Sequence, residues 1–178
     1  AKYKSFETEE EAAKAFEKGY EHYLKTASSS KAAAGLTPKA PVGKPIWESL
    51  CVDAACSGNP GDMEYRGVYP PTMQEIFRIG PLKKGTNNIG EFLALVHGLA
   101  LLKQKGSSLP IYSDSRNAIG WVKKKKCKTL LERVPENEPI FDLIERAEKW
   151  LKTNTYTTPI LKWETSEWGE IPADFGRK

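Results

Sequence analysis

Four acidic residues of this 178-residue chain lie where a carboxylate is costly or unusual. Asp53 interrupts the apolar segment LCVDAA, where a buried, ionised carboxylate costs several kcal/mol unless something compensates it. Asp114 follows another apolar segment, Glu91 comes near the start of a helical pattern, and Asp174 lies near the last residue. Together they would repel one another unless divalent cations neutralised them. Mg²⁺ and Mn²⁺ favour carboxylate oxygens, and two such ions can activate water and stabilise the leaving oxygen of a phosphodiester.

Each acid taken alone also has an ordinary structural explanation. Asp114 could cap the helix that follows it, Glu91 could interact with a helix dipole, and Asp174 could simply be solvated. Asp53 is the exception, because aspartate in the middle of a strand has poor β propensity and poor burial energetics. The prediction of a metal site therefore rests on the four residues as a set.

The elements that must position these acids begin near residue 46. From there the pattern predicts an α/β domain with a mixed five-stranded sheet flanked by helices, in the order β-β-β-α-β-α-α-β-α. In such sheets, ligands bind at the C-terminal edge of the strands, where Asp114 is expected. The predicted strands cover 50–55, 65–69, 74–79, 110–114 and 160–164, and the predicted helices cover 86–105, 116–125, 139–152 and 171–177.

The residues before this domain form two further segments. Residues 1–24 have the pattern of a strand and a helix, but they are too few to bury a core of their own, which indicates a truncated small domain. Residues 25–45 are rich in Ser, Ala, Lys, Gly and Pro and are typical of a flexible basic linker.

Composition limits the class of protein. The formal net charge is +4, which permits a nucleic-acid partner without requiring one. No apolar run approaches the roughly 20 residues of a membrane helix, so no membrane association is expected, and nothing implies a protein partner. Three cysteines without Cys-x-x-Cys spacing argue against a disulfide framework or a structural zinc site and favour a reducing, cytoplasmic location.

Four motifs, in order and spacing, carry a resemblance to a known family: CVDAACSGNPG, TNNIGE, IYSDS and a closing ADFG. Residues 46–178 resemble type 1 ribonuclease H, and residues 1–24 resemble the second half of the viroplasmin-like hybrid-binding module often found ahead of that enzyme. The resemblance implies a ribonuclease H-like catalytic domain over 46–178. It implies Asp53, Glu91, Asp114 and Asp174 as catalytic residues that hold two Mg²⁺ ions, or Mn²⁺, with Asp53 shared by both ions.

The resemblance also implies a reaction and a substrate. The reaction is endonucleolytic hydrolysis of the RNA strand of an RNA·DNA hybrid, leaving 5′-phosphate and 3′-hydroxyl ends. A 2′-hydroxyl both donates and accepts hydrogen bonds, so amide and backbone groups can test for it. The alternative for the pair Asn87 and Asn88, which we favour less, is plain helix capping. The implied substrate-binding residues are Cys56, Gly58, Asn59, Lys84, Thr86, Asn87, Asn88 and Ser115.

The sequence departs from the family in the loop before the last aspartate. Many members have a histidine there, whereas this chain has glutamates, and we expect Glu167 or Glu170 to replace it in part as a proton acceptor or metal lure. The run KKKKCK lies where some members have a basic protrusion, so Lys123 and Lys124 could contact phosphates, although a lysine run is often just a solvated surface.

The sequence leaves two other functions open. One is a different nuclease of the same fold, against which the GNPG turn and the asparagine pair argue. The other is a non-catalytic protein that binds RNA·DNA hybrids, which the presence of all four acids disfavours.

Overall fold

The computed structural model describes residues 43–176. The strand and helix predicted within residues 1–24, and the linker up to residue 42, lie outside the described residues. Residues 43–49 form no regular helix or strand and lead directly into the first strand. Among residues 43–176 no helix is long and apolar enough to cross a membrane.

The centre of the fold is the predicted five-stranded mixed sheet, with strand order β3-β2-β1-β4-β5. Short turns connect the first three strands, which pair antiparallel, whereas β4 and β5 run parallel to β1 after helical crossovers. The strands are β1 (Leu50–Cys56), β2 (Gly61–Tyr69), β3 (Gln74–Gly85), β4 (Ile111–Ser113) and β5 (Ile160–Lys162).

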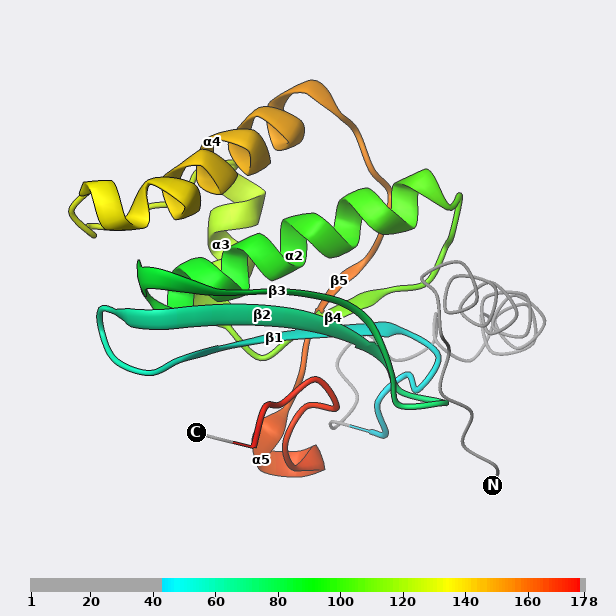
Figure 1. The fold of residues 1–178 in the computed structure, drawn as a ribbon. Coiled ribbons are helices and arrows are strands. Elements are labelled where there is room, and N and C mark those ends of the chain that lie inside the picture. Colours follow the sequence, from blue (N-terminus) through cyan, green and yellow to red (C-terminus); the bar gives the residue numbers. More distant parts are fainter. Residues whose placement is uncertain (1–42, 177–178) are drawn as a thin grey trace.

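Three helices cover one face of the sheet, and a fourth, very short helix lies on the other face (Figure 1). A 3₁₀ turn, Pro135–Asn137, leads into the third helix. The three covering helices match those predicted to within one or two residues. The helices are α2 (Asn87–Gln104), α3 (Arg116–Lys124), α4 (Glu138–Thr153) and, on the opposite face, α5 (Thr165–Trp168).

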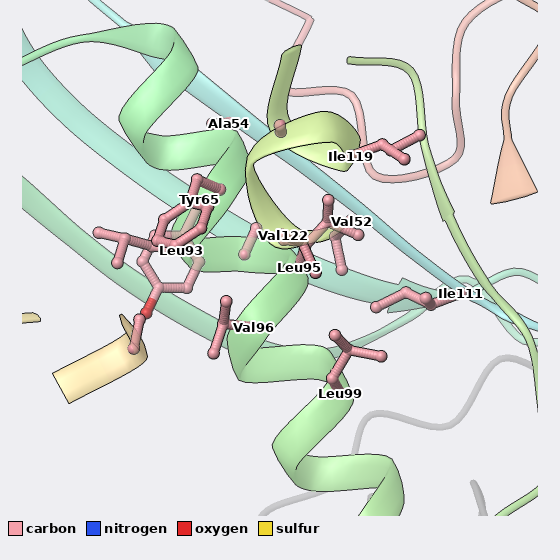
Figure 2. Close-up of a cluster of buried hydrophobic side chains, with 14 of the residues drawn as sticks. Val52, Ala54, Tyr65, Leu93, Leu95, Val96, Leu99, Ile111, Ile119 and Val122 are labelled. Atoms are coloured by element: carbon pink, nitrogen blue, oxygen red, sulfur yellow. The ribbon is translucent and has the colours of Figure 1, made fainter. Parts of the chain in front are cut away.

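Side chains alternate along β1 and so divide between two apolar clusters. Leu50, Val52 and Ala54 belong to the large cluster under α2 and α3, part of which Figure 2 shows, whereas Cys51 belongs to the smaller cluster on the opposite face. Asp53 has the same parity as Cys51 and lies in the middle of this buried strand. The smaller cluster consists of Cys51, Val68, Tyr112, Trp163, Ile171 and Ala173.

Helix α2 approaches β1 closely because it has a glycine at the contact. A Cβ atom added to Gly90 would lie 2.7 Å from the Cβ of Ala54, which is too close for two packed carbon atoms. Thr86 precedes the helix, and its Oγ1 accepts the N–H of Ile89 at 3.2 Å, as expected of an N-cap. These two features place the start of α2 against the end of β1.

The helix predicted over 171–177 is wrong. In the described part of that range, residues 171–174 form a single turn in which the N–H of Asp174 donates to the carbonyl of Ile171 at 2.8 Å. The backbone then leaves the helical path, because Gly176 takes a φ of +71° and its N–H donates to the Asp174 carboxylate at 2.9 Å. Asp174 therefore does not open a helix, and α5, which periodicity did not indicate, lies earlier in the chain.

Candidate active site

Three of the four predicted carboxylates meet at one edge of the sheet. Asp53, Glu91 and Asp114 each offer an oxygen atom, and these atoms all lie within 4.8 Å of one another. Asp53 and Glu91 are almost completely buried, and Asp114 is half-buried. We call these three residues the acidic group.

Strand register explains why two of these residues meet. Strands β1 and β4 are parallel neighbours, and Cys51 is the partner of Tyr112. Asp53 and Asp114 each come two residues after these partners, so they lie side by side, Asp53 in the middle of β1 and Asp114 directly after β4. The edge where β4 ends is of the kind at which ligands commonly bind in such sheets.

Helix α2 supplies the third carboxylate. Gly90 lies against Ala54 of β1, so the next residue, Glu91, is held beside Asp53. Each acid thus comes from a different element, and the sheet and the helix fix their separations.

The acidic group fits a hard divalent cation. Such ions bind oxygen at about 2.1 Å in octahedral geometry, which places ligand atoms roughly 3–4 Å apart. Oxygen atoms already within 4.8 Å of one another need only small side-chain rotations to reach that spacing. The donor set also suits the ion, because carboxylate oxygens are what Mg²⁺ and Mn²⁺ prefer.

A family model described as RNase H matches residues 48–162, a range that contains the whole acidic group. The chain belongs to the ribonuclease H family. Ribonuclease H of Rickettsia bellii is 31% identical over 137 residues, which cover 70% of this chain and 83% of that protein. Ribonuclease H of Rhodopirellula baltica is 41% identical over 75 residues. That match covers 41% of this chain and 46% of that protein, so this chain spans about half of that relative's length. RNase H1 of Halobacterium salinarum, a solved structure, has a TM-score of 0.42 at 19% identity, covering 67% of this chain and 86% of that one.

Asp174, the fourth predicted ligand, lies beyond the range matched by the ribonuclease H model and is not one of the three residues of the acidic group. Its main chain is fastened to the sheet by Arg66 of β2, whose Nη2 donates to the Asp174 carbonyl at 2.6 Å. Arg66 is the strand partner of Asp53, which belongs to the acidic group. Arg66 therefore connects the segment that carries Asp174 to the strand position beside Asp53. Sequence reasoning missed Arg66, because only the register of β1 with β2 shows that it lies opposite Asp53.

The predicted substrate-binding residues gather around the turn between β1 and β2 and the start of α2. Gly58, Asn59, Asn87 and Asn88 are exposed there. Cys56 is half-buried, and its Sγ donates to the Gly58 carbonyl at 2.8 Å, which shapes the turn. An open cleft of about 380 Å³ runs between these elements; its lining is Ala55, Cys56, Ser57, Asp62, Glu64, Pro81 and Asn87.

The other predicted binding residues have structural partners of their own. Lys84, at the end of β3, pairs with Glu136 at 3.2 Å, and Thr86 caps α2. Ser115 caps α3, because its Oγ accepts the N–H of Ala118 at 3.1 Å. These roles do not conflict with substrate contact, since a capping hydroxyl still has a hydrogen to donate.

The four predicted accessory residues are all exposed. Lys123 and Lys124 form the last turn of α3. Glu167 lies in α5, and Glu170 lies in the loop that joins α5 to the turn carrying Asp174. The structure thus puts the two glutamates on the same face of the sheet as the C-terminal segment.

Proposed function

We propose that this protein is a type 1 ribonuclease H that hydrolyses the RNA strand of RNA·DNA hybrids in a divalent-cation-dependent reaction. The products are RNA fragments with 5′-phosphate and 3′-hydroxyl ends. The observation that carries the proposal is the acidic group itself: three carboxylates with oxygen atoms within 4.8 Å of one another, inside the matched ribonuclease H range.

The acidic group would hold the cations, and the family resemblance implies Asp53 as the ligand shared by two of them. Divalent cations bound to such a group activate water and stabilise the leaving oxygen of a phosphodiester. Asp174 would add the fourth carboxylate from the C-terminal segment. The protein's own contribution is to keep these oxygen atoms in place against their mutual repulsion, which burial of Asp53 and Glu91 makes severe without cations.

Substrate recognition would come from the exposed amides at the start of α2 and in the turn after β1. Asn59, Asn87 and Asn88 each carry both donors and acceptors, which is what a 2′-hydroxyl requires. The hydroxyl hydrogen of Thr86 can be donated to a phosphate oxygen while its Oγ1 accepts from Ile89, and Lys84 lies two residues away. Cys56, Gly58 and Ser115 would line the RNA strand.

The proposed domain arrangement follows the sequence interpretation. Residues 46–178 would be the catalytic domain, and residues 1–24 would be part of a hybrid-binding module joined to it by the linker at 25–45.

A cleavage assay tests the proposed activity. A labelled RNA·DNA hybrid is incubated with Mg²⁺, with Mn²⁺ and with a chelator, alongside duplex DNA, duplex RNA and single-stranded RNA. We expect cleavage of the hybrid only, in the presence of the cation only. Asp53→Asn should abolish cleavage, whereas Asp142→Asn, a change at an exposed residue of α4, should leave it intact.

Three outcomes would contradict the proposal. Binding of the hybrid without cleavage would identify a non-catalytic binding protein. Cleavage of duplex DNA or duplex RNA in preference to the hybrid would identify a different nuclease of the same fold. Cleavage by the Asp53→Asn variant would show that the acidic group does not take part in the reaction.

A further inference from the structure

A row of charged residues crosses three strands next to the acidic group. Arg66 of β2 is the strand partner of Asp53 on one side and of Arg78 on the other. Directly opposed side chains point to the same face of a sheet, so all three lie on the face opposite α2. Two arginines directly opposite each other destabilise a sheet unless their charges are compensated.

Two glutamates and one aromatic ring compensate the two arginines. Arg78 donates to the nearly buried Glu64 at 2.6 Å and contacts Glu75 at 3.3 Å, and Arg66 lies 3.7 Å from the same Glu75 carboxylate. The ring of Phe175 has both guanidinium groups over it, with its centroid 4.9 Å from Arg66 and 5.2 Å from Arg78. The hydrogen bond to Glu64 raises the pKa of Arg78, which keeps it charged.

Arg66 also binds the main chain of the C-terminal segment. Its Nε donates to the carbonyl of Ala173 at 2.8 Å, and its Nη2 donates to the carbonyl of Asp174 at 2.6 Å. The two hydrogen bonds fix consecutive carbonyl groups, and Phe175 stacks immediately beyond them. Because the side chain of Arg66 is only 22% exposed, these bonds are largely shielded from water.

We propose that Arg66 is the positioning residue for Asp174: it sets where this carboxylate lies relative to Asp53. The proposal rests on the ribonuclease H function proposed above. No regular helix holds residues 171–176, so the position of Asp174 depends on side-chain contacts from the sheet. Arg66 is the strand neighbour of Asp53 and also binds this segment. A change in that contact would therefore move Asp174 relative to the acidic group.

The chemistry of this contact requires arginine. The planar guanidinium presents several N–H groups in a rigid fork, so one side chain can hold two successive carbonyls and still stack on an aromatic ring. Lysine at the same position has one compact ammonium group, which would hold one carbonyl and would not stack in the same way. We therefore expect Arg66→Lys to restore part of the function that Arg66→Met removes.

Hydrogen–deuterium exchange tests the positioning role without any metal or substrate. In the metal-free full chain, Arg66→Met should increase the exchange rate of the amides of Asp174 and Gly176 at least about tenfold. Amides of β1 and α2 should keep their rates. Arg146→Met, which removes an exposed arginine of α4, is the matched control and should change neither region.

A double-mutant cycle on hybrid cleavage tests whether Arg66 acts through Asp174. Arg66→Met should lower kcat about ten- to a hundredfold with little change in KM, and Arg66→Lys should recover part of the loss. In an Asp174→Asn background the same change should have almost no further effect, because the carboxylate that Arg66 positions is already gone.

The outcomes separate this inference from the proposed function. Wild-type protein that does not cleave hybrid overturns the function, while the exchange experiment still measures whether Arg66 holds the segment. Unchanged exchange at residues 174–176 in Arg66→Met overturns the positioning role. Losses in kcat that multiply in the double mutant also overturn it. Faster exchange throughout β1 and α2 in Arg66→Met, together with a lower urea midpoint, would assign the residue to stability alone.

Discussion

The contact between Gly90 and Ala54 predicts a specific effect on both stability and cleavage. In Gly90→Ala, the new Cβ would lie 2.7 Å from the Cβ of Ala54 and 3.2 Å from the Cγ of Met63. Carbon atoms pack at roughly 3.5–4.0 Å, so α2 must move by about 1 Å at this point. Glu91 is the next residue, so the movement is transmitted to the acidic group.

A matched substitution separates the packing cost of Gly90→Ala from its gain in helix propensity. Alanine in place of glycine inside a helix gains about 1 kcal/mol, and overpacking a core costs about 1–3 kcal/mol. Gly120 of α3 has no atom within 4 Å of an added Cβ, so Gly120→Ala should show the gain alone. Urea unfolding should therefore find Gly90→Ala less stable than Gly120→Ala by about 1–3 kcal/mol.

Cleavage of the hybrid should distinguish the two variants further. A misplacement of about 1 Å at a catalytic group can cost on the order of a hundredfold in rate, so we expect Gly90→Ala to lose most of its kcat while Gly120→Ala keeps wild-type activity. Equal stability and equal kcat in the two variants would refute the reasoning that the close contact at Gly90 sets the position of Glu91.

Three further predictions concern the remaining features. Burial raises the pKa of the Cys127 thiol from 9.0 to about 12, so the folded state retains a proton that the unfolded chain loses. Stability from this residue should be complete below about pH 9 and fall by up to about 4 kcal/mol as pH rises to 12. Burial raises the pKa of the Cys51 thiol to about 12 as well, so Cys127→Ala should have a shallower slope than wild type in urea unfolding rather than none. Replacing Lys123 and Lys124 with Gln should weaken hybrid binding and make the binding constant depend less steeply on salt concentration. If titrations at several salt concentrations give the wild-type slope, the two lysines do not contact phosphates. Gln in place of Glu167 or Glu170 should slow turnover about tenfold at one of the two positions, and full activity in both variants would end that assignment.

Much of the framework could be predicted because its signals are local. An aspartate inside the apolar segment LCVDAA has few structural explanations, and the apolar periodicity after Thr86 identifies α2 to within a residue. The five strands follow from short apolar runs separated by turn residues. Asp53 and Asp114 then lie together because each comes two residues after a partner of the parallel pair Cys51 and Tyr112.

The C-terminal segment could not be predicted because non-local contacts decide its structure. Pro172 and the acid that follows at Asp174 are typical of a helix start, but the carbonyls of residues 173 and 174 bond to Arg66, more than a hundred residues earlier. Gly176 then takes a left-handed conformation, which ends the turn. In sequence, Arg66 resembles any polar residue of a half-exposed strand, and only the register of β1 with β2 shows that it lies opposite Asp53.

The central claim is that Asp53, Glu91 and Asp114 together hold divalent cations. A crystal of the full chain soaked in Mn²⁺ tests this claim most directly, because anomalous scattering locates the ion. We predict a peak within coordination distance of carboxylate oxygens of all three residues, and its loss in Asp53→Asn. A Mn²⁺-soaked crystal with no peak at the acidic group, or with peaks only at other acidic side chains, would contradict the account.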